Sequence, residues 1–401
     1  MNWTAAGNAP KNFAGSRIAL AFSAAAIILS GALACAPSSR AQQEGPIISP
    51  EVGADHRVTF RFRDPNAKEV LLELDSMPKA MAPGPQKPLP MTKDDHGVWS
   101  VTTDPLDPDY YGYSFIADGV GLDDPANSRL TPNLIYHSSQ MHVPGPPDLS
   151  WELTDVPHGV LHHHFYHSAI VGDDRDYYVY TPPGYDPHAK APYPVLYLLH
   201  GYSDDASGWT AVGRANIILD NLIAQGKAKP MLVVMTLGYG APEVIQFGWR
   251  LQGHMDVFQK NYERFRDALI GEVIPAIEVS YNVSKDGKDR AIAGLSMGGS
   301  ETLYTGLNML DRFAYIGAFS AGGLNEDYAK DFPGLDSTAN AKLKGLWISC
   351  GKGDGLIVPN TKLKDWLVSK GIKVQWVETP GVHQWQVWRR NLTAFVPQLF
   401  Q

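Results

Sequence analysis

Residues 294–298 read GLSMG, a G-x-S-x-G pentapeptide with Ser296 at its centre. An apolar run at 291–293 precedes it, and residues 299–303 after it are typical of the start of a helix. This order predicts a strand, a sharp turn and a helix, which is the local fold that presents a serine hydroxyl at the edge of a sheet. Glycine on both sides of the serine lets strand and helix approach closely. The motif favours an α/β fold in which Ser296 is a nucleophile.

Strand and helix patterns alternate through residues 148–401. Continuous apolar runs at 195–199 and 231–235 are typical of strands that are covered on both faces. Apolar residues at 258, 262, 265 and 269 predict one face of an amphipathic helix, prolonged by 273 and 277. The alternation implies the α/β class, with a mostly parallel sheet between helices. Other expected elements are strands at 177–180, 316–319, 346–350 and 374–377, and a closing helix over 388–399.

Residues 48–145 show strand-like alternation and turns without a helical period. Val58, Phe60 and Phe62 share one face of a predicted strand, and residues 110–117 form another that ends in an Asp-Gly turn. We expect a small all-β sandwich here, followed by a stiff proline-rich linker at 143–147. The predicted organisation is a leader at 1–41, an all-β module at 42–147 and an α/β domain at 148–401.

The first 41 residues contain three basic residues and no acidic one. An apolar run at 18–34 ends in a small-x-small pattern, which is typical of a cleaved secretory signal peptide. Two alternatives remain open: an uncleaved membrane anchor, for which the run is short, and a lipid-modified cysteine at Cys35. Each places the protein outside the cytoplasm, in the periplasm, secreted or lipid-anchored at the cell surface.

Charge and cysteine content exclude several kinds of partner and cross-link. The formal net charge is −8, and no basic block follows the leader. This argues against nucleic acid or an anionic membrane surface as a partner. The two cysteines are Cys35 and Cys350, so removal or lipidation of Cys35 leaves no possible internal disulfide. No segment after the leader is apolar enough to span a membrane.

Two downstream residues are candidates for the partners that a serine nucleophile needs. A serine hydroxyl requires a base that takes its proton, and that base requires an orienting carboxylate. In hydrolase topology the three arrive in the order serine, acid, histidine, each after a strand. Asp354 follows the strand predicted at 346–350, and His383 follows the strand predicted at 374–377. We therefore predict Asp354 as the acid and His383 as the base.

Other interpretations of these positions remain open at this stage. Asp354 lies among glycines and is also suited to cap a turn, and a loop histidine need not have any role. Glu378 and Asp365 are the alternative acids. Glu378 directly precedes the turn, but it lies on the same predicted strand that leads to His383.

A tetrahedral intermediate also needs hydrogen-bond donors for its oxyanion. The sequence predicts the backbone N–H groups of Met297, which follows the serine, and of Tyr202, in the loop after the strand at 195–199. Three tryptophans are candidates for the wall of a pocket that takes flat or sugar-like groups, although core packing explains each of them equally well. They are Trp209, Trp249 and Trp385.

Five histidines within ten residues suggest a metal site. A strand sends His162 and His164 to one face and His163 and His167 to the other, and no cysteine or nearby carboxylate joins them in sequence. A structural strand is therefore favoured over a metal site, and the expected chemistry requires neither a metal nor an organic cofactor. The cluster comprises His158, His162, His163, His164 and His167.

Four segments together resemble carbohydrate esterase family 1, which includes feruloyl and acetylxylan esterases and is related to enterochelin (siderophore) esterases. The segments are 198–201 (LLHG), 214–223 (RANIILDNLI), 293–299 (AGLSMGG) and 313–320 (FAYIGAFS). The resemblance covers residues 155–401 and implies an α/β-hydrolase fold. It also implies a catalytic triad of Ser296, Asp354 and His383.

The front segment has a resemblance of its own. Residues 111–115 (YGYSF) and 122–127 (LDDPAN) are similar to the early-set, Ig-like modules of the family 48 carbohydrate-binding type that often precede such esterases. One position departs from the family pattern, because Tyr202 stands where relatives often carry a further glycine. The departure implies a narrower acyl pocket.

These observations predict an exported serine esterase that cleaves feruloyl or acetyl esters of xylan-type polysaccharides. A siderophore esterase is the alternative within enzymes, because relatives divide between the two substrate classes. A non-catalytic glycan-binding surface protein is the alternative from another class, and the complete set of triad residues in the expected order argues against it.

Overall fold

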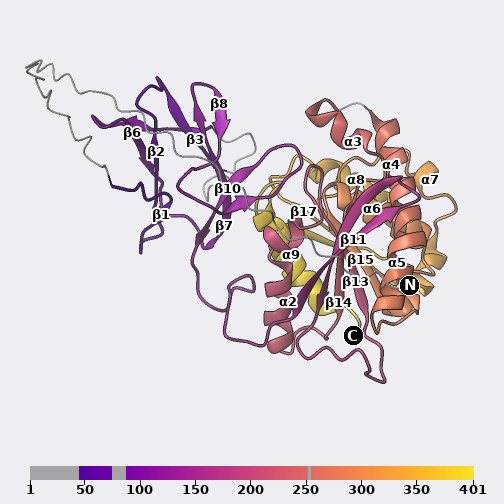
Figure 1. Ribbon diagram of the computed structural model, residues 1–401. Coiled ribbons are helices and arrows are strands. Elements are labelled where there is room, and N and C mark those ends of the chain that lie inside the picture. Colours follow the sequence, from indigo (N-terminus) through magenta and orange to yellow (C-terminus); the bar gives the residue numbers. More distant parts are fainter. Residues whose placement is uncertain (1–44, 75–86, 252–253) are drawn as a thin grey trace, which may run out of the picture. The chain divides into compact units, whose positions relative to one another are not determined.

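The computed structural model describes residues 45–74, 87–251 and 254–401, with the side chains of Trp249 and Leu251 excepted (Figure 1). The expectations for the leader and for Cys35 lie outside the described residues. Residues Ile47–Gln401 form one compact unit. Among the described residues of this unit, the elements up to residue 143 are all strands, and strands and helices alternate from residue 160 onward.

An eight-stranded sheet organises the second part of the chain. Its strand order is β11-β12-β14-β13-β15-β16-β17-β18. The first two strands pair antiparallel, and the strands from β14 to β18 are all parallel. The prediction of a mostly parallel sheet is confirmed. The strands are β11 (Val160–Ser168), β12 (Asp173–Thr181), β13 (Val195–Leu199), β14 (Leu232–Thr236), β15 (Arg290–Leu295), β16 (Tyr315–Phe319), β17 (Gly345–Gly351) and β18 (Gln375–Thr379).

Helices cover both faces of this sheet (Figure 1). One core cluster joins α2 and α9 to side chains from one face, and a second joins α4, α5, α6 and α8 to side chains from the other. The central strands are buried throughout, because both of their faces are covered. The helices are α1 (Gly208–Ala211), α2 (Ala215–Ala224), α3 (Glu243–Gln246), α4 (Met255–Ala268), α5 (Ile274–Ser280), α6 (Met297–Asn308), α7 (Tyr328–Asp331), α8 (Ile357–Ser369) and α9 (Trp385–Phe395), with 3₁₀ turns at Gly248–Leu251, Gly287–Asp289, Ser337–Ala341 and Val396–Gln398.

The amphipathic helix predicted from residue 258 is formed by α4 and α5. A π-helical turn, Leu269–Val273, joins the two helices without a break in the chain's course. Phe265 and Ile277 both lie in the core between these helices and one face of the sheet. The predicted apolar face of the helix is therefore the face that is buried.

The part before residue 143 consists of two sheets that share one core. The first has the order β1-β2-β6-β5, and the second has the order β4-β3-β7-β10-β9 with β8 paired to β7. Val58, Phe60 and Phe62 are buried, as their alternation predicts. The strands are β1 (Glu51–Val52), β2 (Val58–Arg63), β3 (Val70–Leu74), β4 (Leu89–Pro90), β5 (Thr92–Lys93), β6 (Val98–Thr102), β7 (Asp109–Ala117), β8 (Val120–Leu122), β9 (Leu130–Thr131) and β10 (Ser138–Val143).

A buried ion pair joins β7 to α9. The Arg389 guanidinium donates from Nε to Asp109 Oδ1 at 2.9 Å and from Nη2 to the Tyr110 carbonyl at 2.7 Å. The same side chain donates to the Val212 carbonyl at 2.9 Å. Asp109 and Arg389 are both almost completely buried. The all-β part is therefore fastened to the helix that begins directly after the loop of His383.

Candidate active site

Ser296 lies on the turn between β15 and α6, as the motif predicts. Its backbone has a φ of 51°, in the left-handed region that non-glycine residues rarely adopt. A Cβ atom on Gly294 would lie 2.4 Å from the Gly298 carbonyl oxygen, and one on Gly298 would lie 2.3 Å from the His200 carbonyl oxygen. Both glycines of the motif are therefore required sterically, because strand, turn and helix approach too closely for any side chain.

The structure brings Ser296, His383 and Asp354 together. His383 Nε2 lies 2.9 Å from Ser296 Oγ, and His383 Nδ1 lies 2.9 Å from Asp354 Oδ2. The Asp354 carboxyl is buried, and its other oxygen accepts a hydrogen bond from the Leu356 N–H at 2.8 Å. With the proton on Nδ1 held by Asp354, Nε2 is left to accept a proton from the serine.

The electrostatics of Asp354 suit an ionised carboxylate. Burial by itself raises the pKa of this carboxyl, but the hydrogen bond and charge of His383, together with the Leu356 N–H, lower the pKa below its ordinary value. The alternative acids lie elsewhere: Glu378 accepts from the Trp376 indole at 3.1 Å, and Asp365 pairs with Lys364. The geometry therefore selects Asp354 among the three candidates.

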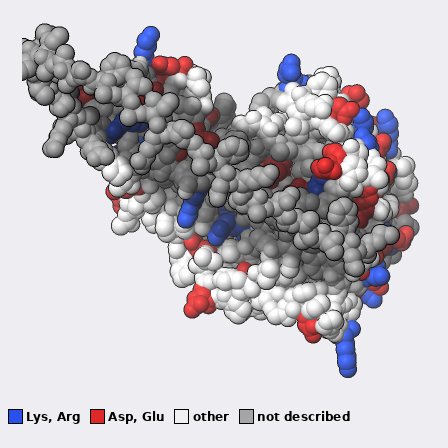
Figure 2. All heavy atoms as spheres, viewed as in Figure 1, with Lys and Arg blue, Asp and Glu red and all other residues white. Residues whose placement is uncertain are grey.

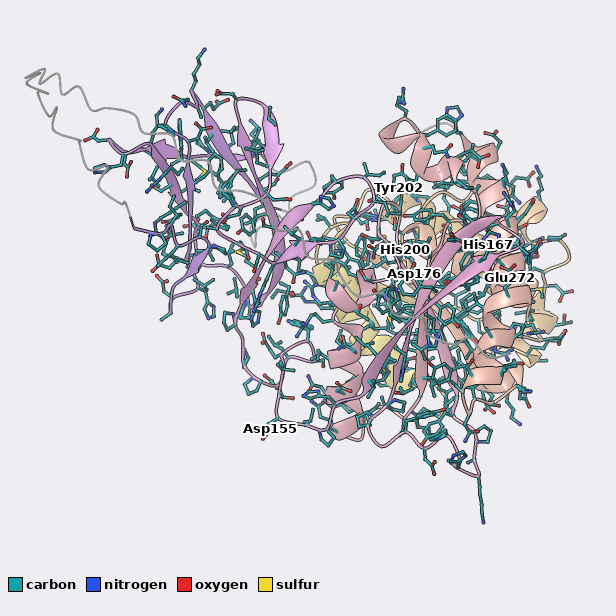
Figure 3. All side chains as sticks on the ribbon, in the orientation of Figure 1. Asp155, His167, Asp176, His200, Tyr202 and Glu272 are labelled. Atoms are coloured by element: carbon teal, nitrogen blue, oxygen red, sulfur yellow. The ribbon has the colours of Figure 1, made fainter. Side chains whose placement is uncertain are left out.

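The loop after β13 runs beside the serine and carries Tyr202. A Cβ atom on Gly201 would lie 3.4 Å from the Ser296 Cβ, which is van der Waals contact, and 2.5 Å from Leu295 Cδ1. The loop therefore passes directly beside the nucleophile. The buried His200 ring fixes this loop through two hydrogen bonds. Its Nδ1 donates to the Gly201 carbonyl at 2.8 Å, and its Nε2 accepts from the Gly238 N–H at 2.9 Å. Burial lowers the pKa of His200 to about 4, so the ring is neutral in this role. Tyr202 and His200 are both labelled in Figure 3.

A cavity of about 340 Å³ opens onto Ser296 and His383. Its walls come from both parts of the chain, since residues from β7, from the 133–136 segment and from β10 face the loops of the large sheet. No lysine or arginine is among its described lining residues. The aromatic side chains of the wall are Tyr110, Tyr111, Tyr136, Tyr202, Trp385 and Trp388.

The three tryptophans of the sequence analysis have different outcomes. Trp385 lines the cavity, as expected. Trp209 does not, and that expectation is wrong: its side chain is only 1% exposed, its indole N–H donates to the Leu199 carbonyl, and it packs edge-to-face behind Trp385 with ring centroids 5.2 Å apart. Trp249 lies in a 3₁₀ turn, and its side chain is outside the described residues.

Several wall residues were not predicted from sequence. Tyr111, Asn133, Tyr136 and Gln140 come from the all-β part, and Asp204 comes from the loop after β13. The sequence indicates Tyr111 as part of a strand and of the Ig-like resemblance, and the others lie in segments with the composition of ordinary turns or strands. Only tertiary packing brings them to the serine.

Four of the five histidines lie on β11, and His158 lies two residues before it. Among the described residues, each of the five side chains forms a hydrogen bond with another side chain. His163 and His167 pair with Asp176 and Asp174 of β12, at 2.7 and 2.8 Å. His164 on the opposite face bonds the Tyr281 hydroxyl at 2.6 Å. In the part of the chain that the structure describes, no group of three or more His, Cys, Asp or Glu side chains is arranged to hold a metal ion. These carboxylates come from the neighbouring strand and were not foreseen.

Comparison with known proteins assigns the chain to a family. The family model named Esterase matches residues 168–399. The chain belongs to the esterase family. The match contains β12 to α9, and so includes the serine turn and the loops of Asp354 and His383.

Curated relatives include two bacterial proteins. An endo-1,4-β-xylanase/feruloyl esterase of Xylanibacter ruminicola is 31% identical over 371 residues, which are 91% of this chain and 47% of that protein. An acetyl esterase of Caldicellulosiruptor saccharolyticus is 25% identical over 231 residues, 49% of this chain and 80% of that protein. This chain thus spans about half the length of the first relative.

Solved structures share the fold of this esterase. An enterobactin esterase of Shigella flexneri superimposes with a TM-score of 0.62 at 20% identity, over 86% of this chain and 93% of that one. A family 1 ferulic acid esterase of Anaeromyces mucronatus gives a TM-score of 0.54 at 22% identity, over 64% and 96% of the two chains. The α/β-hydrolase fold is confirmed, and the likeness to the first structure extends beyond the matched family region.

Two surface properties complete the description of this esterase. Acidic and basic side chains are interspersed on the face drawn in Figure 2. Across the described ranges, the helices are all too short or too polar to cross a membrane.

Proposed function

We propose that this esterase is a serine carboxylic-ester hydrolase with Ser296, His383 and Asp354 as its catalytic residues. The observation that supports this most directly is the continuous chain of hydrogen bonds from Ser296 Oγ through the His383 ring to the buried Asp354 carboxylate, at the base of a cavity. Each step has the distance and the direction that general-base activation of a serine requires.

The reaction follows from this arrangement. Ser296 Oγ attacks the ester carbonyl while His383 Nε2 takes the hydroxyl proton, and Asp354 holds the ring in the required tautomer. The backbone N–H groups of Met297 and Tyr202 stabilise the oxyanion of the tetrahedral intermediate. His383 then gives the proton to the departing alcohol. Water, activated by the same histidine, releases the acid from the acyl-enzyme.

We propose feruloyl or acetyl esters of xylan-type polysaccharides as the substrates. The printed names of the curated relatives, a xylanase/feruloyl esterase and an acetyl esterase, support this class. The aromatic wall of the cavity supports it as well, because tyrosine and tryptophan rings pack against flat acyl groups and sugar rings. Export through the leader at 1–41 would place the protein where such polymers are found.

Siderophore ester hydrolysis is the second candidate, and the structural likeness to an enterobactin esterase over 86% of this chain favours it. The charge of the cavity argues against it. An iron-bound catecholate ligand is strongly anionic and would require cationic partners, whereas the described lining residues include no lysine or arginine.

Ferulate release from feruloylated arabinoxylan tests the proposal. We expect the parent to release ferulate and Ser296→Ala to lose about 10⁴–10⁶-fold in kcat. Ser369→Ala is the matched control, because that hydroxyl lies at the exposed end of α8 and bonds only the Trp366 carbonyl among the described residues.

Two other outcomes would change the proposal in different ways. If the parent cleaves short aryl acetates but releases no ferulate, the serine mechanism stands and the feruloyl substrate is wrong. If neither parent nor control cleaves any ester, while the protein binds xylan, the glycan-binding alternative takes the place of the esterase.

A further inference from the structure

Asp204 is a buried titratable residue that the proposed mechanism does not use. It follows β13, lines the cavity and is 6% exposed. A Cβ atom on Gly201 would lie 3.5 Å from Asp204 Oδ2 and 3.4 Å from the Ser296 Cβ. The Asp204 carboxyl and the nucleophile therefore border the same glycine.

The surroundings place this carboxyl at the inner wall of the cavity. A Cβ atom on Gly208 would lie 3.4 Å from the Asp204 Cβ and 3.6 Å from the Trp385 ring. Asp204 is thus next to the indole that forms part of the cavity wall. A substrate group that enters between the nucleophile and this indole meets the carboxyl.

Asp204 is also held in place from two directions. The Tyr239 hydroxyl donates to its backbone carbonyl at 2.8 Å. The Asn133 amide lies 3.4 Å from Oδ1, and the Leu134 N–H donates to the carbonyl of the preceding Ser203 at 2.7 Å. The two carbonyl contacts fix the backbone at 203–204 from both parts of the chain, and the Asn133 amide is the one of these groups that holds the carboxyl itself.

The charge state of Asp204 makes it a versatile hydrogen-bonding group. Among the described residues, no lysine, arginine or histidine forms an ion pair with it. Burial, with a smaller contribution from the charge of Asp205, raises the pKa of the carboxyl to about 8, against the opposing effects of the Gly201 backbone and the Asn133 amide. Near neutral pH the group is a carboxylic acid, which both donates and accepts a hydrogen bond.

We propose that Asp204 is a specificity-determining residue that binds a hydroxyl group of the ester substrate. This inference rests on the proposed esterase function. A hydroxyl matches a neutral carboxylic acid, because each group can both donate and accept a hydrogen bond. An anionic substituent would find no lysine or arginine among the described lining residues. The hydroxyl belongs either to the aromatic ring of the acyl group or to the sugar that carries the ester, and both sources have the same chemistry.

Paired substrates distinguish the two sources. One pair is methyl 4-hydroxycinnamate and methyl cinnamate, which differ only in the acyl hydroxyl. The other is a monoacetylated xylopyranoside and cyclohexyl acetate, which differ in the sugar oxygens. The quantity measured is the ratio of kcat/KM within each pair, because a purely structural role of Asp204 would lower both members of a pair together.

We expect the parent to favour the hydroxylated member in one of the two pairs. Asp204→Leu is expected to reduce that ratio about 5- to 20-fold, the loss of a buried hydrogen bond to a neutral group. Asp204→Asn keeps a donor and an acceptor and is expected to preserve most of the ratio. Asp174→Leu, at a carboxylate that is 94% exposed on β12, is the matched control and should leave the ratio unchanged.

Each failure has a distinct meaning. If the parent prefers neither hydroxylated member, or if Asp204→Leu keeps the full ratio, the inference is wrong while the esterase remains. The first of these results requires no variant, so it holds even if Asp204→Leu does not fold. If the parent and Ser296→Ala cleave esters equally, the proposed function fails before the role of Asp204 is reached.

Discussion

At the scale of single residues, the site combines a strained serine with a rigid histidine. Ser296 has a positive φ that the surrounding contacts enforce, and steric contact leaves no space for side chains at Gly294 and Gly298. The His383 ring packs edge-to-face on Trp388, with centroids 4.9 Å apart, and bonds Asp354 on its other side. Several contacts thus fix the orientation of each side chain, which is typical of catalytic groups that must be oriented before the substrate binds.

Asp354→Asn tests the orientation of that histidine. An amide in place of the carboxylate removes the charge and presents an N–H toward Nδ1, which favours the tautomer whose Nε2 cannot accept the serine proton. We expect kcat on a short aryl acetate to fall about 10³–10⁴-fold with little change in KM. Asp365→Asn is the matched control, since that carboxylate pairs with Lys364 on α8. An equal loss in the control, or none at Asp354, would contradict the assignment.

At the scale of elements, the loop after β13 depends on the segment at 133–136 of the all-β part. Ser203 has a φ of 71°, and Asn133 holds it there with an Nδ2 donor 2.9 Å from the serine Oγ. The same Asn133 accepts from the Ile135 and Tyr136 N–H groups at 3.0 and 3.2 Å. The loop that carries the Tyr202 N–H is therefore fixed from outside the large sheet.

Asn133→Asp separates these two roles of Asn133. The aspartate keeps the acceptor for Ile135 and Tyr136. It replaces the amide donor that faces Ser203 and Asp204 with a carboxyl oxygen, to which the Ser203 hydroxyl can donate but which is placed against the Asp204 carboxyl, so the 133–136 turn survives while the loop loosens. We expect kcat to fall about 3- to 10-fold through poorer oxyanion stabilisation, with KM changed less. Asn340→Asp, at an exposed position that bonds Ser337 and Gly371 carbonyls, is the control. A rise in KM alone would mean that Asn133 shapes only the cavity.

Local sequence patterns were sufficient to predict the strands, the helices and the triad residues. They were not sufficient to predict the residues of the cavity wall. The strand before Ser296, and the strands before Asp354 and His383, each have their own apolar run, so chain order alone placed the three residues at one edge of the sheet. Asp204 lies in a polar loop whose composition predicts a turn, and its burial depends on Asn133, which is 71 residues away in sequence. Trp209 could not be assigned, because a buried and a wall-forming tryptophan have the same sequence pattern.

At the scale of the whole molecule, the buried pair of Asp109 and Arg389 couples the all-β part to the catalytic loop. Arg389 is on α9, which begins two residues after His383, and Gln386 on the same helix donates to the Tyr110 carbonyl at 2.9 Å. Arg390 adds a contact to Asp109 Oδ2 at 3.0 Å. Because Asp109 and Arg389 are almost completely buried, the attraction between their charges is needed to offset the hydration that both lose.

A double-mutant cycle at this pair tests the coupling. Asp109→Leu leaves the buried Arg389 without its carboxylate, and Arg389→Met leaves the buried Asp109 with only the partly exposed Arg390 as an ionic partner. Each change is therefore expected to lower the free energy of unfolding by about 3–5 kcal/mol, with the larger loss for Asp109→Leu. The double variant removes both charges and is expected to lose less than the sum of the single changes, by at least about 1 kcal/mol. Urea unfolding measures the stability, and kcat on an aryl acetate reports whether His383 moves with α9.

The corresponding cycle at Arg266 and Asp267, an ion pair on the surface of α4 at 2.9 Å, is the control and should change stability by less than about 1 kcal/mol. If the effects at Asp109 and Arg389 were simply additive, the pair would not act as a unit. If stability fell without any loss of kcat, the all-β part would support the fold but not the orientation of His383. A parallel loss of both is expected, because the helix that contains Arg389 is also the helix that ends the His383 loop.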